Sequence, residues 1–305
     1  MTTNPNPHDE NRITRAMKVF FGAPLSKLAF DTFVKCAAVA QSLVVRPIDG
    51  VEVCNPTPLT REEFERVHDE EYVEALITGE PRDLAASNGV GWTKGLFPAI
   101  AQSNGALRDA VLHALRTRGI AGALSSGLHH ARRERGAGYC SANGIVIAAL
   151  AALDAGAKRV LILDFDAHAG GGTASLIAGI AGIEQVDVSV NGYDRYKDTP
   201  NARLVIARPA DYLDAIEAAL ASIEDPTSID VVIYNAGVDV HEFAGGMPGI
   251  TTEVVKEREC AVFAWARAND LPVAWTLAGG YTGTLTMDEV VDLHRLLIET
   301  AAAAA

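Results

Sequence analysis

The sequence predicts a single α/β domain in which helices cover both faces of a mostly parallel central β-sheet. Short β-rich runs alternate with longer helical patterns along the chain, and this alternation is typical of parallel sheets. The 305 residues are 49% hydrophobic, which is enough to bury a large core, and no Pro-rich linker, charge block or internal repeat divides them. We expect the domain to span residues 13–305, behind a polar, disordered leader over residues 1–12.

The hydrophobic pattern predicts six strands and seven helices, taken in chain order. The strands are short apolar runs, and they cover residues 17–21, 119–124, 159–165, 185–190, 229–235 and 271–277. The helices are longer stretches in which apolar residues recur at helical spacing, and they cover residues 25–43, 61–76, 97–118, 143–155, 210–223, 251–268 and 287–300. The alanines at 301–305 carry no pattern.

Polar side chains stand in the loops that follow four of these strands. The run 159–163 leads into Leu163-Asp-Phe-Asp-Ala-His168, and three other strands are followed by the His129-His130 pair, by Asp239 and by Tyr281. Each loop contains glycine, which lets the backbone approach a ligand closely. Ligands of open α/β sheets bind at the carboxyl edge of the strands, so we expect these side chains to converge on one site.

Asp166 and His168 have the spacing of a chelating pair. Residues i and i+2 point to the same side of an extended chain, and a carboxylate with an imidazole suits zinc or a neighbouring transition metal. Asp239 is the best candidate for a third ligand, and an Asp-His-Asp set with one open position is typical of a catalytic site. A structural interpretation stays open for each residue: Asp239 could cap a turn, and the Asp–His pair could be held by hydrogen bonds alone.

The remaining polar residues suit proton transfer. One imidazole of His129 and His130 can take a proton from water while the other stabilises charge or protonates a leaving group, and Asp164 can orient one of them. Tyr281 follows a Gly-Gly pair and can donate to an oxyanion. Taken alone, the histidine pair is a weak motif, Asp164 could be an N-cap, and Tyr281 could be an aromatic lid. Cys140 is expected to be a small packed residue rather than a nucleophile.

Charge and cysteine content limit the partners. The balance of 26 basic and 39 acidic residues gives a net charge of −13, which disfavours nucleic acid and allows a cationic small substrate. The 4 cysteines show no paired spacing, and neither a signal peptide nor a membrane-spanning apolar run is present. We therefore expect a cytoplasmic protein without a membrane partner.

The motifs, in their order along the chain, resemble those of a known family. Gly-Leu-His-His-Ala, Gly-Ala-Gly-Tyr-Cys, Asp-Phe-Asp-Ala-His, Tyr-Asn-Ala-Gly-Val-Asp and Ala-Gly-Gly-Tyr together resemble the zinc-dependent histone deacetylases of the arginase–deacetylase fold. The resemblance runs from about Lys18 to the last helix. It is closest to the class IV branch and to a bacterial-type homologue, because Ala169 rather than a second histidine follows the metal-ligating motif.

This resemblance implies one Zn²⁺ per chain and a role for each candidate residue. Matched by position, the zinc ligands are Asp166, His168 and Asp239; the catalytic residues are His129, His130, Asp164 and Tyr281; the substrate contacts are Gly138, Tyr139 and Gly280. A structural K⁺ near the zinc is also implied, with Ser189 as the matching serine.

The chain departs from the family pattern in two places. Where relatives carry an acidic or amide residue between two glycines, this chain has Gly171, so the resemblance implies that His130 lacks its polar partner. The loop over residues 87–92 has no acidic residue with which several relatives grip a substrate backbone.

Together, these observations predict zinc-dependent hydrolysis of an N-acyl amide, acetyl or longer, on lysine, a polyamine or a small metabolite. Two alternatives stay open. A dimanganese ureohydrolase of the arginase or agmatinase type shares the fold, but it needs aspartates where this chain has Gly170 and His241. A catalytically impaired module that binds acylated ligands is the other alternative, favoured mildly by Gly171. The oligomeric state is not predicted.

Overall fold

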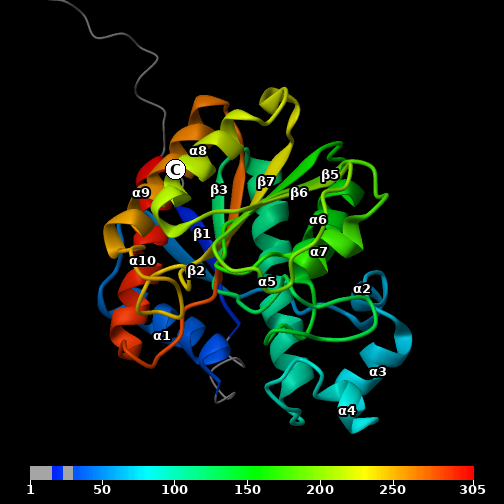
Figure 1. The fold of residues 1–305 in the computed structure, drawn as a ribbon. Coiled ribbons are helices and arrows are strands. Elements are labelled where there is room, and N and C mark those ends of the chain that lie inside the picture. Colours follow the sequence, from blue (N-terminus) through cyan, green and yellow to red (C-terminus); the bar gives the residue numbers. More distant parts are fainter. Residues whose placement is uncertain (1–15, 23–29) are drawn as a thin grey trace, which may run out of the picture.

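The computed structural model describes residues 16–22 and 30–305. Its centre is one sheet in which every neighbouring pair of strands is parallel, in the order β2-β1-β3-β8-β7-β4-β5-β6 (Figure 1). The strands are β1 (Met17–Phe20), β2 (Val51–Cys54), β3 (Ile120–Ala123), β4 (Val160–Asp164), β5 (Ile183–Ser189), β6 (Ala202–Ile206), β7 (Val231–Gly237) and β8 (Val273–Ala278). The predicted α/β class with a parallel sheet is confirmed.

Two strands, β2 and β6, were not expected from the sequence. They form the two edges of the sheet, and much of each is open to solvent: Val53, Val205 and Ile206 are all exposed. An edge strand buries less of its surface than a central strand, so it does not need the continuous apolar run that marked β4 and β7, whose residues are all buried.

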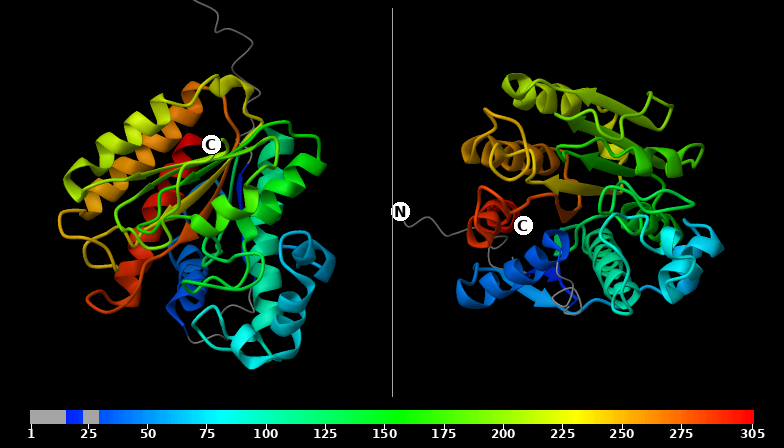
Figure 2. Two further views of the ribbon diagram at one scale, coloured as in Figure 1. Left: turned by 45° about the vertical axis from the view of Figure 1, so that its right-hand side comes forward. Right: turned by 60° about the horizontal axis from the view of Figure 1, so that its bottom comes forward.

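Helices form a layer on each face of the sheet (Figures 1 and 2). One layer contains α1 (Asp31–Val45), α8 (Tyr212–Ala221), α9 (Thr252–Ala268) and α10 (Met287–Ala304). The other contains α5 (Leu96–Thr117), α6 (Gly144–Asp154) and α7 (Gly171–Ile177), and α2 (Arg61–Glu65), α3 (Glu70–Thr78) and α4 (Arg82–Ala85) lie beside α5. Two short 3₁₀ helices, Pro209–Asp211 and Pro226–Ser228, flank α8.

The expected helix over residues 61–76 is divided into α2 and α3. The break occurs at Asp69, whose extended backbone precedes α3 and whose N–H donates to the carbonyl of Arg133 at 2.8 Å. Helix α7 was not expected, because it begins with glycines, which are poor helix formers. Helix α4 has only 4 residues and was also missed.

The ends of the chain differ from expectation in one respect. Helix α10 continues through the alanine tail to Ala304. The leader over residues 1–12 and residues 25–29 of the first expected helix lie outside the described residues. Among the helices that are described, none is long and apolar enough to cross a membrane.

Candidate active site and metal centre

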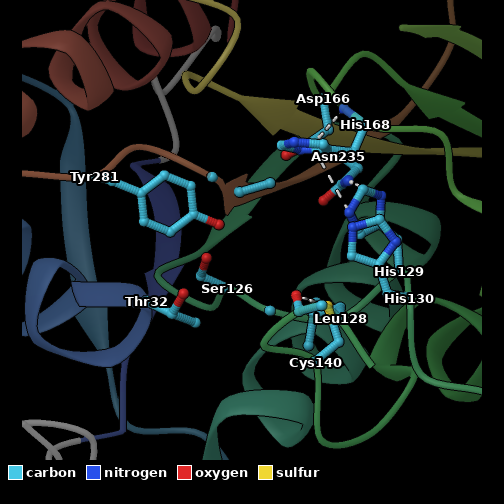
Figure 3. Close-up of a pocket in the computed structure, with 14 residues that line it drawn as sticks. Thr32, Ser126, Leu128, His129, His130, Cys140, Asp166, His168, Asn235 and Tyr281 are labelled. Atoms are coloured by element: carbon cyan, nitrogen blue, oxygen red, sulfur yellow. Dashed lines mark hydrogen bonds and ion pairs between the residues drawn. The ribbon is translucent and has the colours of Figure 1, made fainter. Parts of the chain in front are cut away.

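The candidate residues meet at the carboxyl ends of four strands that are neighbours in the sheet. His129 and His130 follow β3, Tyr281 follows β8, Asp239 follows β7, and the Asp164–His168 segment ends β4. Figure 3 shows Tyr281 on one side of a small cavity and the two histidines on the other, with Asp166 and His168 between them at the top. The parallel order β3-β8-β7-β4 therefore brings together residues that lie up to 152 positions apart in the sequence.

Asp166, His168 and Asp239 form a group that can hold a metal ion. One ligand atom from each lies within 4.8 Å of the others. Nδ1 of His168 is 3.3 Å from Oδ1 of Asp166 and 3.2 Å from Oδ2 of Asp239. Among the described residues, this Oδ2 is buried and has no hydrogen-bond partner. A buried carboxylate oxygen without a partner is costly, and a divalent cation bound by two carboxylates and an imidazole would remove that cost, so the donor set fits zinc.

Two glycines allow the ligand carboxylates to lie against the backbone. A Cβ at Gly279 would come within 2.4 Å of both oxygens of Asp239, and a Cβ at Gly237 would lie 2.4 Å from Oδ2 of Asp166. Gly279 also has a positive φ of 44°, a conformation that other residues rarely adopt. Gly237 at the end of β7 and Gly279 in the loop after β8 are therefore needed for close approach.

His129 is held by the buried carboxylate of Asp164, which Asn235 in turn holds in place. Its Nδ1 lies 2.9 Å from Oδ2 of Asp164, and Oδ1 of Asp164 accepts a hydrogen bond of 2.8 Å from Asn235. Burial opposes the charged imidazole, but the Asp164 and Asp166 carboxylates outweigh it and raise the pKa of His129 to about 10. Asp164 therefore faces His129, in the position that the resemblance implied.

The expectation that His130 lacks a polar partner is wrong. Its Nδ1 lies 2.9 Å from Oδ2 of Asp194, a residue in the loop after β5. Burial and the neighbouring His129 lower the pKa of His130, whereas Asp194 acts in the opposite direction. No sequence pattern indicated this contact, because Asp194 stands in an irregular polar segment outside the motifs.

Tyr281 is presented by a turn that a buried lysine supports. Lys35 of α1 is fully buried, its ammonium donates to the carbonyl of Gly279, and Nζ lies 5.4 Å from the centroid of the Tyr281 ring. Burial, with the charges of Asp239 and Asp166, raises the pKa of Tyr281 well above its ordinary value, so the phenol stays protonated and can donate. Its hydroxyl points into the cavity (Figure 3). Lys35 was missed because its position in an amphipathic helix is unremarkable in sequence.

The site has an inner cavity and a wide mouth. The inner cavity, of about 20 Å³, lies beside the metal-ligating group, and its wall is completed by Thr32, Ser126, Leu128 and Cys140. The mouth, of about 950 Å³, is lined by Gly138 and by Tyr139, which packs against Phe30 with ring centroids 4.6 Å apart. His130, His168 and Tyr281 border both spaces, so these three side chains lie where the inner cavity meets the mouth.

Three other expectations can be compared with the structure. Gly280, expected to contact substrate, borders neither cavity and instead packs against Val238 and His294. Cys140 is buried, and burial raises the pKa of its thiol, as expected for a packed residue. His241 braces its own loop: Nε2 is 3.2 Å from the hydroxyl of Thr252, so it lies outside the metal-ligating group.

Comparison with known proteins agrees with this geometry. The histone deacetylase domain family matches residues 32–189, just over half of the chain. Histone deacetylase 2 of Arabidopsis thaliana is 26% identical over 341 residues, covering 98% of this chain and 87% of that protein. The solved HDA15 HD domain has a TM-score of 0.76 at 21% identity, covering 95% of this chain and 89% of that one. Acetylpolyamine aminohydrolase from Burkholderia pseudomallei has a TM-score of 0.75 at 18% identity, covering 95% and 99%.

The parallel sheet, with its site at the carboxyl edge, is the arginase–deacetylase fold. The chain belongs to the histone deacetylase family. It is accordingly a hydrolase that acts on linear amide C–N bonds, a deacetylase.

Proposed function

We propose that the protein holds one zinc ion through Asp166, His168 and Asp239 and removes an acetyl group from an acylated primary amine. Family membership supports amide hydrolysis of acetylated amines. The observation that carries the finer proposal is the buried Oδ2 of Asp239, which accepts no hydrogen bond among the described residues and lies 3.2 Å from Nδ1 of His168.

Zinc, when bound, would act as a Lewis acid that polarises the acyl carbonyl and increases the acidity of the attacking water. The chain's own residues then divide the proton transfers. His130 is the general base, since its lowered pKa favours the neutral ring and its Nδ1 is engaged by Asp194, which leaves Nε2 to take a proton from water. The same nitrogen returns the proton to the departing amine.

His129 and Tyr281 stabilise charge rather than move it. Oδ2 of Asp164 lies 2.9 Å from Nδ1 of His129 and favours a positive charge on its ring, and Nε2 lies on the side of Asp166, at 3.7 Å from Oδ1. Tyr281 donates a hydrogen bond from its phenolic hydroxyl to the oxyanion from the opposite wall of the cavity. Lys35, behind the ring, fixes the turn that carries this tyrosine.

The shape of the site supports acetyl as the acyl group. The amine carries the rest of the substrate, and only the wide mouth has room for it. The acyl group, on the other side of the amide, therefore points into the inner cavity. That cavity measures about 20 Å³, which is room for little more than one water-sized group. A methyl group is of that size, whereas a long acyl chain is far larger.

The two alternatives have less support. A dimanganese site would need aspartates at the positions of Gly170 and His241. Glycine has no ligand atom in its side chain, and the ring of His241 contacts the hydroxyl of Thr252. In the part of the chain that the structure describes, the metal-ligating group is Asp166, His168 and Asp239. The impaired binding module rested on Gly171, and Asp194 removes that reason by supplying a carboxylate to His130.

We also propose a cytoplasmic setting and a structural potassium ion. The four cysteines, Cys36, Cys54, Cys140 and Cys260, are all free thiols, which supports a reducing cytoplasm. A structural potassium ion is proposed near Ser189, which is buried at the end of β5 and donates to the carbonyl of Asn191 at 3.3 Å.

The test is an assay of purified protein with metal analysis. We expect release of acetate from N-acetylated amines that is abolished by a chelator and restored by about one zinc per chain. Two tightly bound manganese ions per chain would contradict this proposal and would favour a ureohydrolase. Absence of metal-dependent release from every acyl length would favour the binding module.

A further inference from the structure

Both oxygens of the Asp194 carboxylate have partners within the protein. Oδ2 lies 2.9 Å from Nδ1 of His130 and accepts a hydrogen bond of 3.1 Å from the backbone N–H of Gly172. Oδ1 forms an ion pair with Arg132, two residues beyond His130. The side chains of His130 and Asp194 are only 5% and 9% exposed. A carboxylate held by three donors cannot rotate away from the imidazole, so it fixes the orientation of the ring and of its Nδ1 proton.

Gly171 is the residue that makes room for this contact. A Cβ at position 171 would lie 2.1 Å from the backbone oxygen of Asp194 and 2.7 Å from its Oδ1. Real Cβ atoms do not come so close, and the first of these neighbours is main chain that cannot rotate aside. Any side chain at position 171 is therefore incompatible with the present position of Asp194.

The backbone of Asp194 shows that its position is imposed by its surroundings. Its φ is 55°, in the left-handed region that residues other than glycine seldom occupy, although aspartate tolerates it better than most. The preceding Tyr193 stands perpendicular to the ring of His130, with centroids 5.0 Å apart, and also faces His168 at 5.9 Å. The same short segment thus forms a wall of the mouth and supplies the carboxylate.

We propose that Asp194 is the positioning residue for His130, replacing a partner that the family pattern expects at position 171, and that Gly171 and Asp194 are a mutually dependent pair. The inference rests on the proposed function, because His130 is the base only if the amide is hydrolysed. Asp194 is not among the residues that line either cavity, and its carboxylate contacts His130, Gly172 and Arg132. It acts through the imidazole, by keeping the proton on Nδ1 and Nε2 free.

A set of four variants tests the contact. Asp194→Ala should lower kcat by about 100-fold with a small change in KM and unchanged zinc content, because it disorients the base without removing a metal ligand. Asp194→Asn keeps a hydrogen-bond acceptor and should retain activity within about tenfold. Gly171→Ala should reproduce the loss by displacing Asp194. The matched control is Gly192→Ala in the same segment, where the nearest atom to a Cβ is 4.0 Å away, and it should leave kcat unchanged.

Coupling between the two positions provides a second criterion. In the Gly171→Ala/Asp194→Ala double variant, the protonated nitrogen of His130 should be the same as in Asp194→Ala alone, because both changes break the same contact. Its kcat can be lower, because the Cβ at position 171 still meets the backbone oxygen of residue 194. Wild-type kcat in Asp194→Ala would overturn the proposal.

Nuclear magnetic resonance of ¹⁵N-labelled histidine separates this proposal from the proposed function. The wild-type zinc-loaded protein should show His130 protonated on Nδ1, and Asp194→Ala should lose that preference even if no substrate is ever found. An unchanged tautomer in Asp194→Ala would contradict the positioning role. A changed tautomer in a protein without deacetylase activity would contradict the proposed function alone.

Discussion

Nδ1 of His168 lies 3.2 Å from Oδ2 of Asp239, and among the described residues nothing donates a hydrogen bond to that oxygen. Asp239 Oδ1 is satisfied by the N–H of Ala167 at 3.2 Å, so the two oxygens of one carboxylate have different surroundings. One oxygen fixes the Asp239 side chain against the loop after β4, and the other faces the remaining ligand atoms. This asymmetry is expected of a metal ligand whose second oxygen is braced by the protein.

Asp239→Asn is therefore expected to reduce zinc binding. Zinc content after dialysis should fall from about one per chain to well below half, and activity should fall by about 100-fold or more at limiting zinc. Metal analysis and a thermal shift on adding zinc measure both effects. Asp211→Asn is the control, because Asp211 is paired with Arg208 on the surface, away from the site. Equal zinc content in Asp239→Asn and the control would rule out Asp239 as a ligand.

Tyr281→Phe separates oxyanion stabilisation from metal binding. The hydroxyl is the only group removed, and the ring keeps its contact with Lys35. We expect kcat to fall by about 100- to 1,000-fold, the loss typical of one oxyanion donor, while zinc content and thermal stability stay unchanged. Steady-state kinetics measure kcat and metal analysis measures zinc content. Wild-type turnover in Tyr281→Phe would show that the hydroxyl has no role in the mechanism.

The residues that sequence reasoning placed in the site share one property: each follows a strand of the central sheet. Asp166 and His168 end an apolar run, and Asp239 ends another, so chain position alone predicted that they meet at one edge. The central strands were predicted for the same reason, since burial on both faces makes them continuously apolar.

Asp194 and Lys35 could not be predicted in this way. Asp194 stands in an irregular loop, and its distance from His130 depends on how that loop folds over Gly171. Lys35 occurs in helix α1, and a lysine in a surface helix normally faces solvent. Here it is buried because the helix packs against the turn at Gly279. Both contacts arise from tertiary structure, which leaves no periodic pattern in the sequence.

Acyl length should be limited by the inner cavity. With room for about one water-sized group beside the reacting centre, acetyl-lysine should be hydrolysed much faster than octanoyl-lysine. Leu128 is 2% exposed and lines this cavity, so Leu128→Ala should raise the octanoyl-to-acetyl ratio of kcat/KM by at least about tenfold. An acyl-lysine panel measures both ratios, and a wild-type preference for octanoyl would show that the acyl group binds elsewhere.

The mouth carries charges of both signs, although the net charge of the chain is −13. The charged residues of its described lining, apart from histidines, are Asp31, Arg132 and Arg135. Arg132 is paired with Asp194, whereas Oδ2 of Asp31 accepts from the uncharged Thr282, so the negative charge of Asp31 remains. Arg135 has no ion pair among the described side chains, so its guanidinium is available to a carboxylate on the substrate.

We therefore expect Arg135 to favour substrates that carry a free carboxylate. Arg135→Ala should lower the ratio of kcat/KM for acetyl-lysine to that for acetylputrescine by up to about fivefold, the effect of one exposed charge. Arg133→Ala removes an equal charge from a neighbouring exposed residue outside the mouth lining and should change this ratio little. Raising the salt concentration should reduce the effect of Arg135→Ala. An unchanged ratio in Arg135→Ala would contradict the role of Arg135.

His68 should make the stability of the protein depend on pH. It is buried, Nδ1 donates to the carbonyl of Arg132 at 2.7 Å, and Nε2 accepts from the N–H of Asn143 at 3.0 Å, so the folded protein requires the neutral ring. Burial lowers the pKa of His68 from 6.5 to about 4. Asn143 in turn bonds the carbonyl of His129, so His68 braces the loop that carries the catalytic histidines.

The sign follows from proton uptake. Below pH 6.5 the unfolded chain binds a proton at His68 that the folded protein does not, so this contribution to the free energy of unfolding is present above pH 6.5 and is lost as the pH falls toward 4. At about 1.4 kcal/mol per pKa unit, the loss is roughly 3 kcal/mol. His68→Gln should be less stable than the wild type at pH 7.5, and the difference should shrink toward pH 4. Urea unfolding at several pH values measures it, and a difference that does not depend on pH would show that His68 contributes packing alone.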